Sequence, residues 1–130
     1  MGERAAVALE LLLVAFGGML GGFGRALVST LVAGLLGERL PWGTFAVNLS
    51  GSLALGFLAG GLAGDPGPAP PLALFLATGL LGSYTTVSTF SLQTLFLLRE
   101  RAFGRALLNV AGSAGLCIAA ASLGFVLAGP

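Results

Sequence analysis

Gly79-Leu-Leu-Gly-Ser-Tyr-Thr-Thr-Val-Ser-Thr-Phe-Ser-Leu-Gln93 places glycine, seven hydroxyl side chains and an amide in the middle of an otherwise apolar chain. Its glycines and the β-branched residues 85–87 weaken regular helix near the centre of a segment long enough to cross a bilayer. Broken backbone at membrane depth persists only where protein or a watery cavity satisfies the freed carbonyls, and half-helix ends hold ions. The stretch therefore predicts an ion site, with a glycine-rich packing face as the alternative.

The composition indicates an all-α integral membrane protein. Of 130 residues, 56% are hydrophobic and only 8% charged, and the mean hydropathy is +1.01, so the chain lacks the polar surface of a soluble domain. A net charge of +1 gives no reason to expect a nucleic-acid partner. The single cysteine, Cys117, excludes an internal disulfide and a cysteine-rich metal cluster. The first apolar stretch runs past any plausible cleavage site, which favours a mature helix over a removable signal.

Four segments are long enough to cross the bilayer, taking about 20 residues for each crossing. The turns between them carry the charges or prolines that the segments lack. The sequence thus predicts one four-helix transmembrane domain over residues 1–130, with the third helix broken near its centre. We expect a dimer, because the polar stripes of four short helices leave sites that only a partner can close. The expected segments are residues 7–36, 42–63, 71–98 and 102–127.

Polar side chains recur at helical spacing on the second and fourth segments. Thr44, Asn48, Gly51 and Ser52 share one face of the second segment. Asn48 matters most, because a primary amide brings two N–H donors as well as an acceptor and can coordinate an anion without adding charge. An interhelical hydrogen bond from Asn48 is the alternative. The fourth segment carries a weaker polar line through Asn109, Ser113 and Cys117.

The first segment combines small residues with an arginine inside its apolar stretch. Gly17 and Gly21, and likewise Gly18 and Gly22, lie four residues apart and leave a flat face for a neighbouring helix. Arg25 follows one turn beyond Gly21. An arginine inside a hydrophobic segment is costly unless it faces protein or water, which makes it a functional candidate. The alternative is that Arg25 reaches the surface near the following turn.

The residues that remain for chemistry are uncharged hydrogen-bond donors. The chain has no histidine and no paired carboxylate within a segment, so we predict that it is not an enzyme. Phe90 offers the positive edge of its ring. Such a lining suits a small hard anion, because it replaces part of the hydration shell without a fixed charge strong enough to trap the ion. The donors are Asn48, Ser52, Ser88, Thr89, Asn109 and Ser113, beside the cation of Arg25.

Three ordered signatures together resemble the Fluc (CrcB) family of fluoride channels, and the match covers nearly the whole chain. They are Gly17-Gly-x-x-Gly21-x-x-x-Arg25, Thr44-Phe-Ala-Val-Asn48-x-x-Gly51-x-x-x-x-Gly56 and Gly79-x-x-Gly82-x-x-Thr85-Thr-x-Ser-Thr-Phe90. The resemblance implies two oppositely oriented four-helix subunits in the plasma (inner) membrane of a prokaryote, with two fluoride pathways between them. It also implies a structural Na⁺ at the centre of the dimer, held by the backbone carbonyls of Gly82 and Thr85. Passive fluoride export would relieve fluoride toxicity.

The same resemblance implies roles for individual side chains. Asn48 is similar to the family's pore asparagine, Arg25 to its first-helix arginine and Phe90 to the second of its two pore phenylalanines. Val87 stands where the first phenylalanine is expected, and Gln93 where a glutamate usually follows the motif. Ser88, Thr89 and Ser113 match the family's polar track.

Two other hypotheses follow from the placement of charges. Leaving out Arg25, the turns hold Arg39, Arg99, Arg101 and Arg105, whereas the N-terminal side has only Arg4. The positive-inside rule then favours one orientation, so the chain could pair with a related subunit of opposite bias instead of with itself. A small proton-coupled multidrug transporter, with Glu10 as proton carrier, is the alternative from another class; the position of Glu10 so near the segment start speaks against it.

Overall fold

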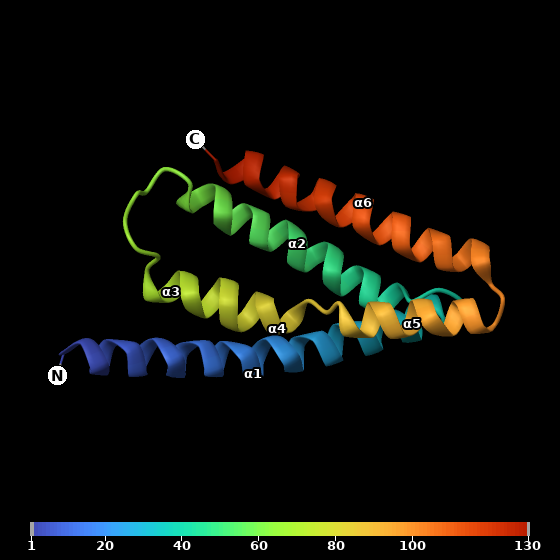
Figure 1. Cartoon of the computed structure of the whole chain (residues 1–130), viewed down its shortest axis with the longest axis horizontal. Helices are drawn as coiled ribbons and strands as arrows, with labels where there is room; N and C mark the ends of the chain where they lie inside the picture. The colour runs from blue at the N-terminus through green and yellow to red at the C-terminus, as the bar shows by residue number, and fades with distance from the viewer. Residues whose placement is uncertain (1, 130) are drawn as a thin grey trace.

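The computed structural model describes residues 2–129, and over these residues it is helical without any strand. Its four long helical spans run alternately in opposite directions (Figure 1), and all four are long and apolar enough to cross a membrane. This agrees with the prediction of an all-α protein with four transmembrane segments. The elements are α1 (Gly2–Leu36), α2 (Trp42–Leu62), α3 (Pro71–Ala73), the π-helix η1 (Leu74–Leu81), α4 (Gly82–Tyr84), α5 (Ser88–Arg99) and α6 (Phe103–Ala128).

The helix ends lie close to those expected, with one clear difference at the N-terminus. Helix α1 begins at Gly2 and not at residue 7, because the short polar run before the apolar stretch contains good helix formers and places Glu3 in the first turn, where the helix dipole favours an acid. Gly37, with φ of +79°, takes the left-handed conformation just after α1. Pro71 starts the third span at the position where a proline's missing N–H costs nothing.

The third span contains a π-helical stretch that the sequence did not predict. In η1 the backbone packs directly on α1: a Cβ added at Gly17 would lie 2.6 Å from the Phe75 carbonyl oxygen, and one added at Gly21 would collide with the Leu80 carbonyl oxygen. Gly79 is equally close to α1 from the other side. The predicted packing face of Gly17 and Gly21 is therefore present. A Cβ at Gly22 would meet nothing within 4 Å, so Gly22 does not belong to this contact.

Helices α2 and α6 form a second closely packed pair. Cβ atoms added at Gly56 and Gly60 of α2 would strike the carbonyl oxygens of Ala121 and Phe125 on α6. In the other direction, a Cβ added at Gly124 of α6 would strike the Leu53 carbonyl oxygen of α2. Backbone-to-backbone contact thus replaces the side-chain interdigitation that joins helices of soluble proteins.

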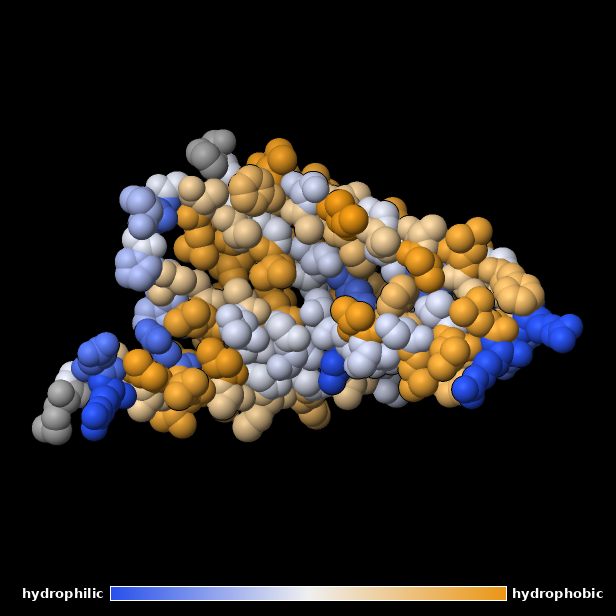
Figure 2. Space-filling view, viewed as in Figure 1, coloured by the Kyte–Doolittle hydropathy of each residue, from blue (hydrophilic) through white to orange (hydrophobic). Residues whose placement is uncertain are grey.

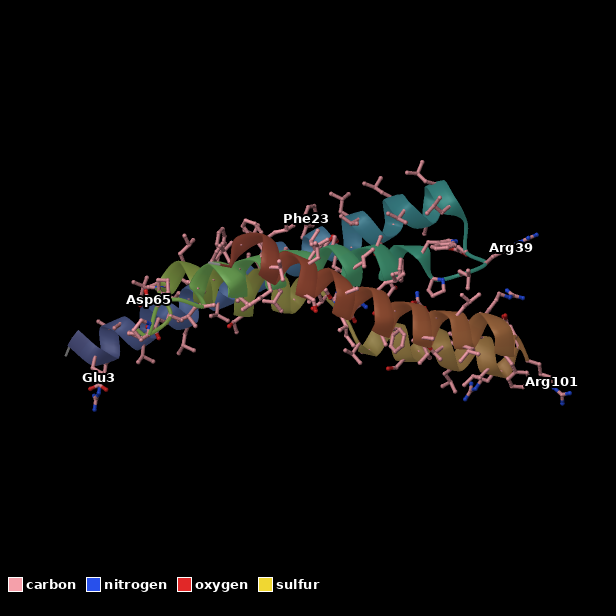
Figure 3. All side chains as sticks on the ribbon, turned by 90° about the horizontal axis from the view of Figure 1, so that it is seen from above. Glu3, Phe23, Arg39, Asp65 and Arg101 are labelled. Atoms are coloured by element: carbon pink, nitrogen blue, oxygen red, sulfur yellow. The ribbon has the colours of Figure 1, made fainter. Side chains whose placement is uncertain are left out.

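Large apolar side chains lie on the outside of the chain. Val47 is the one large side chain of the described residues that is fully buried, at 0% exposure. Apolar residues cover most of the face seen in Figure 2, and hydrophilic residues gather mainly at the two ends of the long axis. Figure 3 places Glu3 and Asp65 at one end and Arg39 and Arg101 at the other. This distribution fits an apolar slab bounded by two polar surfaces.

Candidate functional site

The third span is interrupted between α4 and α5. Helix α4 ends at Tyr84, Thr85 is extended with φ of −76° and ψ of 156°, and α5 starts at Ser88. The non-helical linker lies between the two labelled helices in Figure 1, well inside the length of the bundle. Backbone groups that a continuous helix would pair are therefore placed next to α2.

Asn48 of α2 bonds the backbone of this linker with both ends of its amide. Its Nδ2 donates to the Thr86 carbonyl oxygen at 2.8 Å, and the Thr86 amide donates to its Oδ1 at 2.7 Å. This pairing is the interhelical hydrogen bond that the sequence left open as the alternative role of Asn48. Because the amide nitrogen carries two hydrogens, one N–H remains for another acceptor.

Thr86 is the residue that sequence reasoning missed. Its side chain is only 7% exposed, and its hydroxyl donates to Thr89 Oγ1 at 3.2 Å while accepting from the Thr89 amide at 3.2 Å. Ser88 Oγ lies 3.2 Å from the same oxygen. A threonine just before a helix often accepts a hydrogen bond from the backbone amide three residues later. The spacing of Thr86 to Thr89 is the signal that could have identified this cap.

The residue before the linker is fixed on the other side by α1 and α2. The Tyr84 hydroxyl lies 3.0 Å from Ser50 Oγ. A Cβ added at Gly51 would collide with the Thr85 methyl group, and one added at Gly24 would be 3.6 Å from the Tyr84 ring. The two glycines therefore leave the room into which the end of α4 fits.

A separate hydrogen-bonded chain joins α5 to α6. Asn109 Nδ2 donates to Thr94 Oγ1 at 2.8 Å, and that hydroxyl donates to the Phe90 carbonyl oxygen at 2.8 Å. Asn109 is buried, as is Ser113 one turn further along α6. The polar line predicted on the fourth segment thus starts with a structural contact.

The predicted pathway residues fall into two groups. The structure brings Asn48, Ser88 and Thr89 together through Thr86. Outside this cluster, Val87 is 76% exposed and Phe90 is half-buried. Arg25 is half-buried on α1, and Ser113 is buried on α6.

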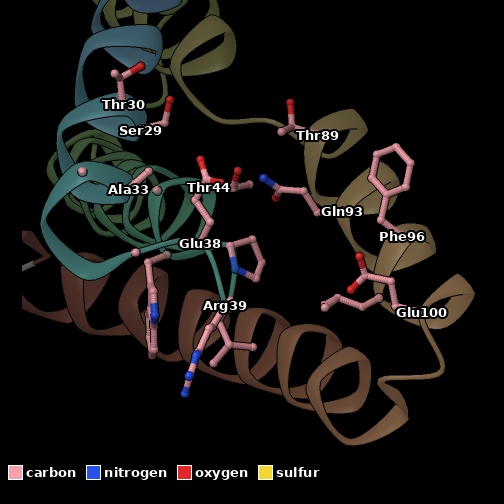
Figure 4. A pocket seen from close by; sticks show the side chains of 17 residues that line it. Ser29, Thr30, Ala33, Glu38, Arg39, Thr44, Thr89, Gln93, Phe96 and Glu100 are labelled. Carbon is pink, nitrogen blue, oxygen red and sulfur yellow. The ribbon is translucent and has the colours of Figure 1, made fainter.

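A half-open pocket of about 770 Å³ leads from one end of the bundle toward this cluster. Its lining includes the charged residues Glu38, Arg39 and Glu100 as well as Thr44 and Thr89 (Figure 4). Gln93 extends across the pocket toward Thr44 in the same view, and its Oε1 is buried without a hydrogen-bond partner. Because Thr89 also contacts Thr86, the pocket connects the surface with the hydroxyl groups at the start of α5.

Comparisons with known proteins give one consistent result. Residues 12–125 match the family described as CrcB-like protein, Camphor Resistance (CrcB). The chain is 47% identical, over 98% of its length and 95% of the relative's, to a protein of Bradyrhizobium diazoefficiens named fluoride-specific ion channel FluC 2. It is 48% identical, over 90% of both chains, to the fluoride-specific ion channel FluC of Opitutus terrae. A sequence match of this extent, on a chain with four membrane-length helices, shows that the protein belongs to the CrcB family.

Proposed function

We propose that this chain is one subunit of a fluoride-selective channel through which fluoride leaves the cytoplasm passively. The observation that carries the proposal is the cluster of uncharged donors around an interrupted helix, in a chain nearly half identical to proteins named fluoride-specific ion channels. The relatives' names also agree with the prediction that the chain is not an enzyme. They favour the channel over the multidrug transporter that the sequence left as an alternative.

The chemistry of the cluster supports an anion as the transported species. The second N–H of Asn48 and the hydroxyls of Ser88 and Thr89 can each donate to a small hard anion, while none of them carries a charge. A neutral lining replaces water around the ion without holding it too strongly to be released. The pocket whose lining includes Thr89 opens this cluster toward one end of the bundle.

The carbonyls of Gly82 and Thr85 support the further proposal of a Na⁺ site. In a continuous helix they would accept from the amides of Thr86 and Thr89. Those amides donate instead to Asn48 Oδ1 and Thr86 Oγ1, so both carbonyl oxygens are left with lone pairs for a ligand. Neutral oxygen ligands suit a hard cation, so the donor set fits the ion that the family resemblance implies. Bound there, Na⁺ would hold the interrupted backbone and neutralise the freed carbonyl dipoles.

The exposed polar residues of α5 support assembly with a second subunit. Ser88 and Thr89 are exposed on the single chain, next to the exposed Val87. Hydroxyl groups and an interrupted backbone at membrane depth require protein or water around them. We propose that an oppositely oriented subunit covers this face in a prokaryotic plasma membrane, and that the second copy is either this chain or a related subunit. The gathering of Arg39 and Arg101 at one end supports a preferred orientation (Figure 3).

Fluoride efflux from liposomes that contain only this purified chain tests the proposal. We expect fluoride to leave and chloride to be retained, and we expect Asn48→Ser to slow the efflux because the shorter side chain loses the amide. Thr78→Val, at an exposed position of η1, is the matched control and should conduct normally. Absence of efflux from a folded dimer would contradict the homodimeric channel; recovery after adding a related subunit would then identify a paired channel.

A further inference from the structure

The interruption of the third span depends on where two backbone amides donate. The Thr86 amide, the helical partner of the Gly82 carbonyl, donates to Asn48 Oδ1 at 2.7 Å. The Thr89 amide, the helical partner of the Thr85 carbonyl, donates to Thr86 Oγ1 at 3.2 Å. In a continuous helix both amides would instead donate to these two carbonyls. The two alternative acceptors therefore compete directly with helix formation across the linker.

Thr86 takes part in both of these non-helical hydrogen bonds. Its own amide is one of the two donors, and its hydroxyl is the acceptor for the other. The hydroxyl caps α5 as an N-cap residue does, since Val87 already has helical torsion angles of −91° and −34°. Its carbonyl meanwhile accepts from Asn48 Nδ2, so the residue is held at three points.

Burial makes the Thr86 hydroxyl difficult to replace. At 7% exposure the Thr86 side chain has little access to water, and its loss removes the acceptor to which the Thr89 amide donates in the structure. That amide would then be left unpaired or would return to the Thr85 carbonyl, which is the helical arrangement. Ser88 and Thr89 would lose the hydroxyl that now connects them.

We infer that Thr86 is a positioning residue: its hydroxyl keeps the third span interrupted and thereby holds the Gly82 and Thr85 carbonyls free. Asn48 is its partner, because the same amide that faces the donor cluster also holds the Thr86 backbone. The consequence for ion binding rests on the proposed channel function. The backbone arrangement itself does not, so the two can be tested separately.

The first test measures hydrogen exchange at single amides by NMR, on the full-length protein in detergent. Thr86→Val keeps the shape of the side chain and removes the hydroxyl. We expect its Thr89 amide to exchange about two- to thirtyfold faster if it is left unpaired, the range that loss of a helix cap gives, and more slowly than the native amide if it returns to the Thr85 carbonyl. Thr86→Ser should restore the native rate, and Thr78→Val should leave it unchanged. If Thr86→Val does not fold, Thr86→Ala removes the same hydroxyl with less bulk. An unchanged Thr89 rate in the hydroxyl-free variant would overturn the inference.

The second test follows fluoride efflux as a function of Na⁺ concentration. We expect the Na⁺ concentration for half-maximal efflux to rise about fivefold or more in Thr86→Val, and to stay native in Thr86→Ser. A variant that lost only stability would lower the amount of active channel without moving this midpoint, so reduced efflux at an unchanged midpoint would contradict the positioning role. If the native chain passes no fluoride at all, the proposed function fails, while the exchange rates still decide the role of Thr86.

Discussion

Replacing Gly21 by alanine should separate α1 from the π-helical part of the third span. The added methyl carbon would collide with the Leu80 carbonyl oxygen and lie 3.1 Å from the Leu80 Cα atom. Both are backbone atoms, so no flexible side chain can move aside. The helices must shift apart, and the contacts of Gly17 and Gly79 in the same interface loosen with them.

The matched control is Gly22→Ala on the same helix, where the methyl group meets nothing within 4 Å. Both variants gain about 1 kcal/mol of helix propensity from replacing glycine. This gain cancels when the two are compared, and the difference between them measures the steric cost. Overpacking a close contact costs roughly 1–3 kcal/mol. We therefore expect Gly21→Ala to be less stable than Gly22→Ala by about 1–3 kcal/mol.

Thermal denaturation of the purified chain in one detergent, followed by the loss of the native gel-filtration peak, would measure this difference. The sign is the critical result, because detergent changes absolute midpoints but acts on both variants alike. Equal midpoints, or a lower midpoint for Gly22→Ala, would refute the close packing of α1 on η1.

Three further predictions concern other contacts. Gly124→Ala should destabilise the α2–α6 pair by about 1–3 kcal/mol relative to Gly115→Ala, whose methyl group enters open space; equal thermal midpoints would contradict this. Asn109→Ala removes the bond to Thr94 and should lower the free energy of unfolding by about 1 kcal/mol, and the loss should shrink in a Thr94→Val background if the bond is its cause. Gln93→Leu removes a buried oxygen without a hydrogen-bond partner and should leave the thermal midpoint equal or raised. Slower fluoride efflux in the same protein would assign the pocket to the ion route. A clear fall in the midpoint would instead show that the amide has a partner.

Features that depend on hydropathy alone could be predicted from the sequence. The four spans follow from the length of the apolar segments and the charges and prolines between them. The early start of α1 at Gly2 was missed because residues 2–6 are polar or small, and hydropathy does not register their helix propensity. The π-helix was missed because its wider turn lies where the backbone packs on α1, and hydropathy does not register such contacts between helices.

The candidate site shows a similar division. The helical spacing of polar residues placed Asn48 on a face turned toward protein, and the structure adds its partner, the Thr86 backbone. Thr86 escaped notice because its spacing to Thr89 indicates a helix cap only once the start of α5 is known, and the stretch holds seven hydroxyl residues. Roles that need a second subunit, such as those of Arg25 and Phe90, stay predictions.

The glycine and carbonyl contacts between helices imply an unusual pattern of tolerance to substitution. In a soluble domain the large buried side chains are the sensitive positions, and surface residues change freely. Here Val47 is the large side chain with no exposure, whereas Gly21, Gly56 and Gly124 each touch the backbone of a neighbouring helix. A complete substitution scan should therefore find the smallest residues the least replaceable, with leucine and phenylalanine exchanging freely for other apolar residues along most of the chain.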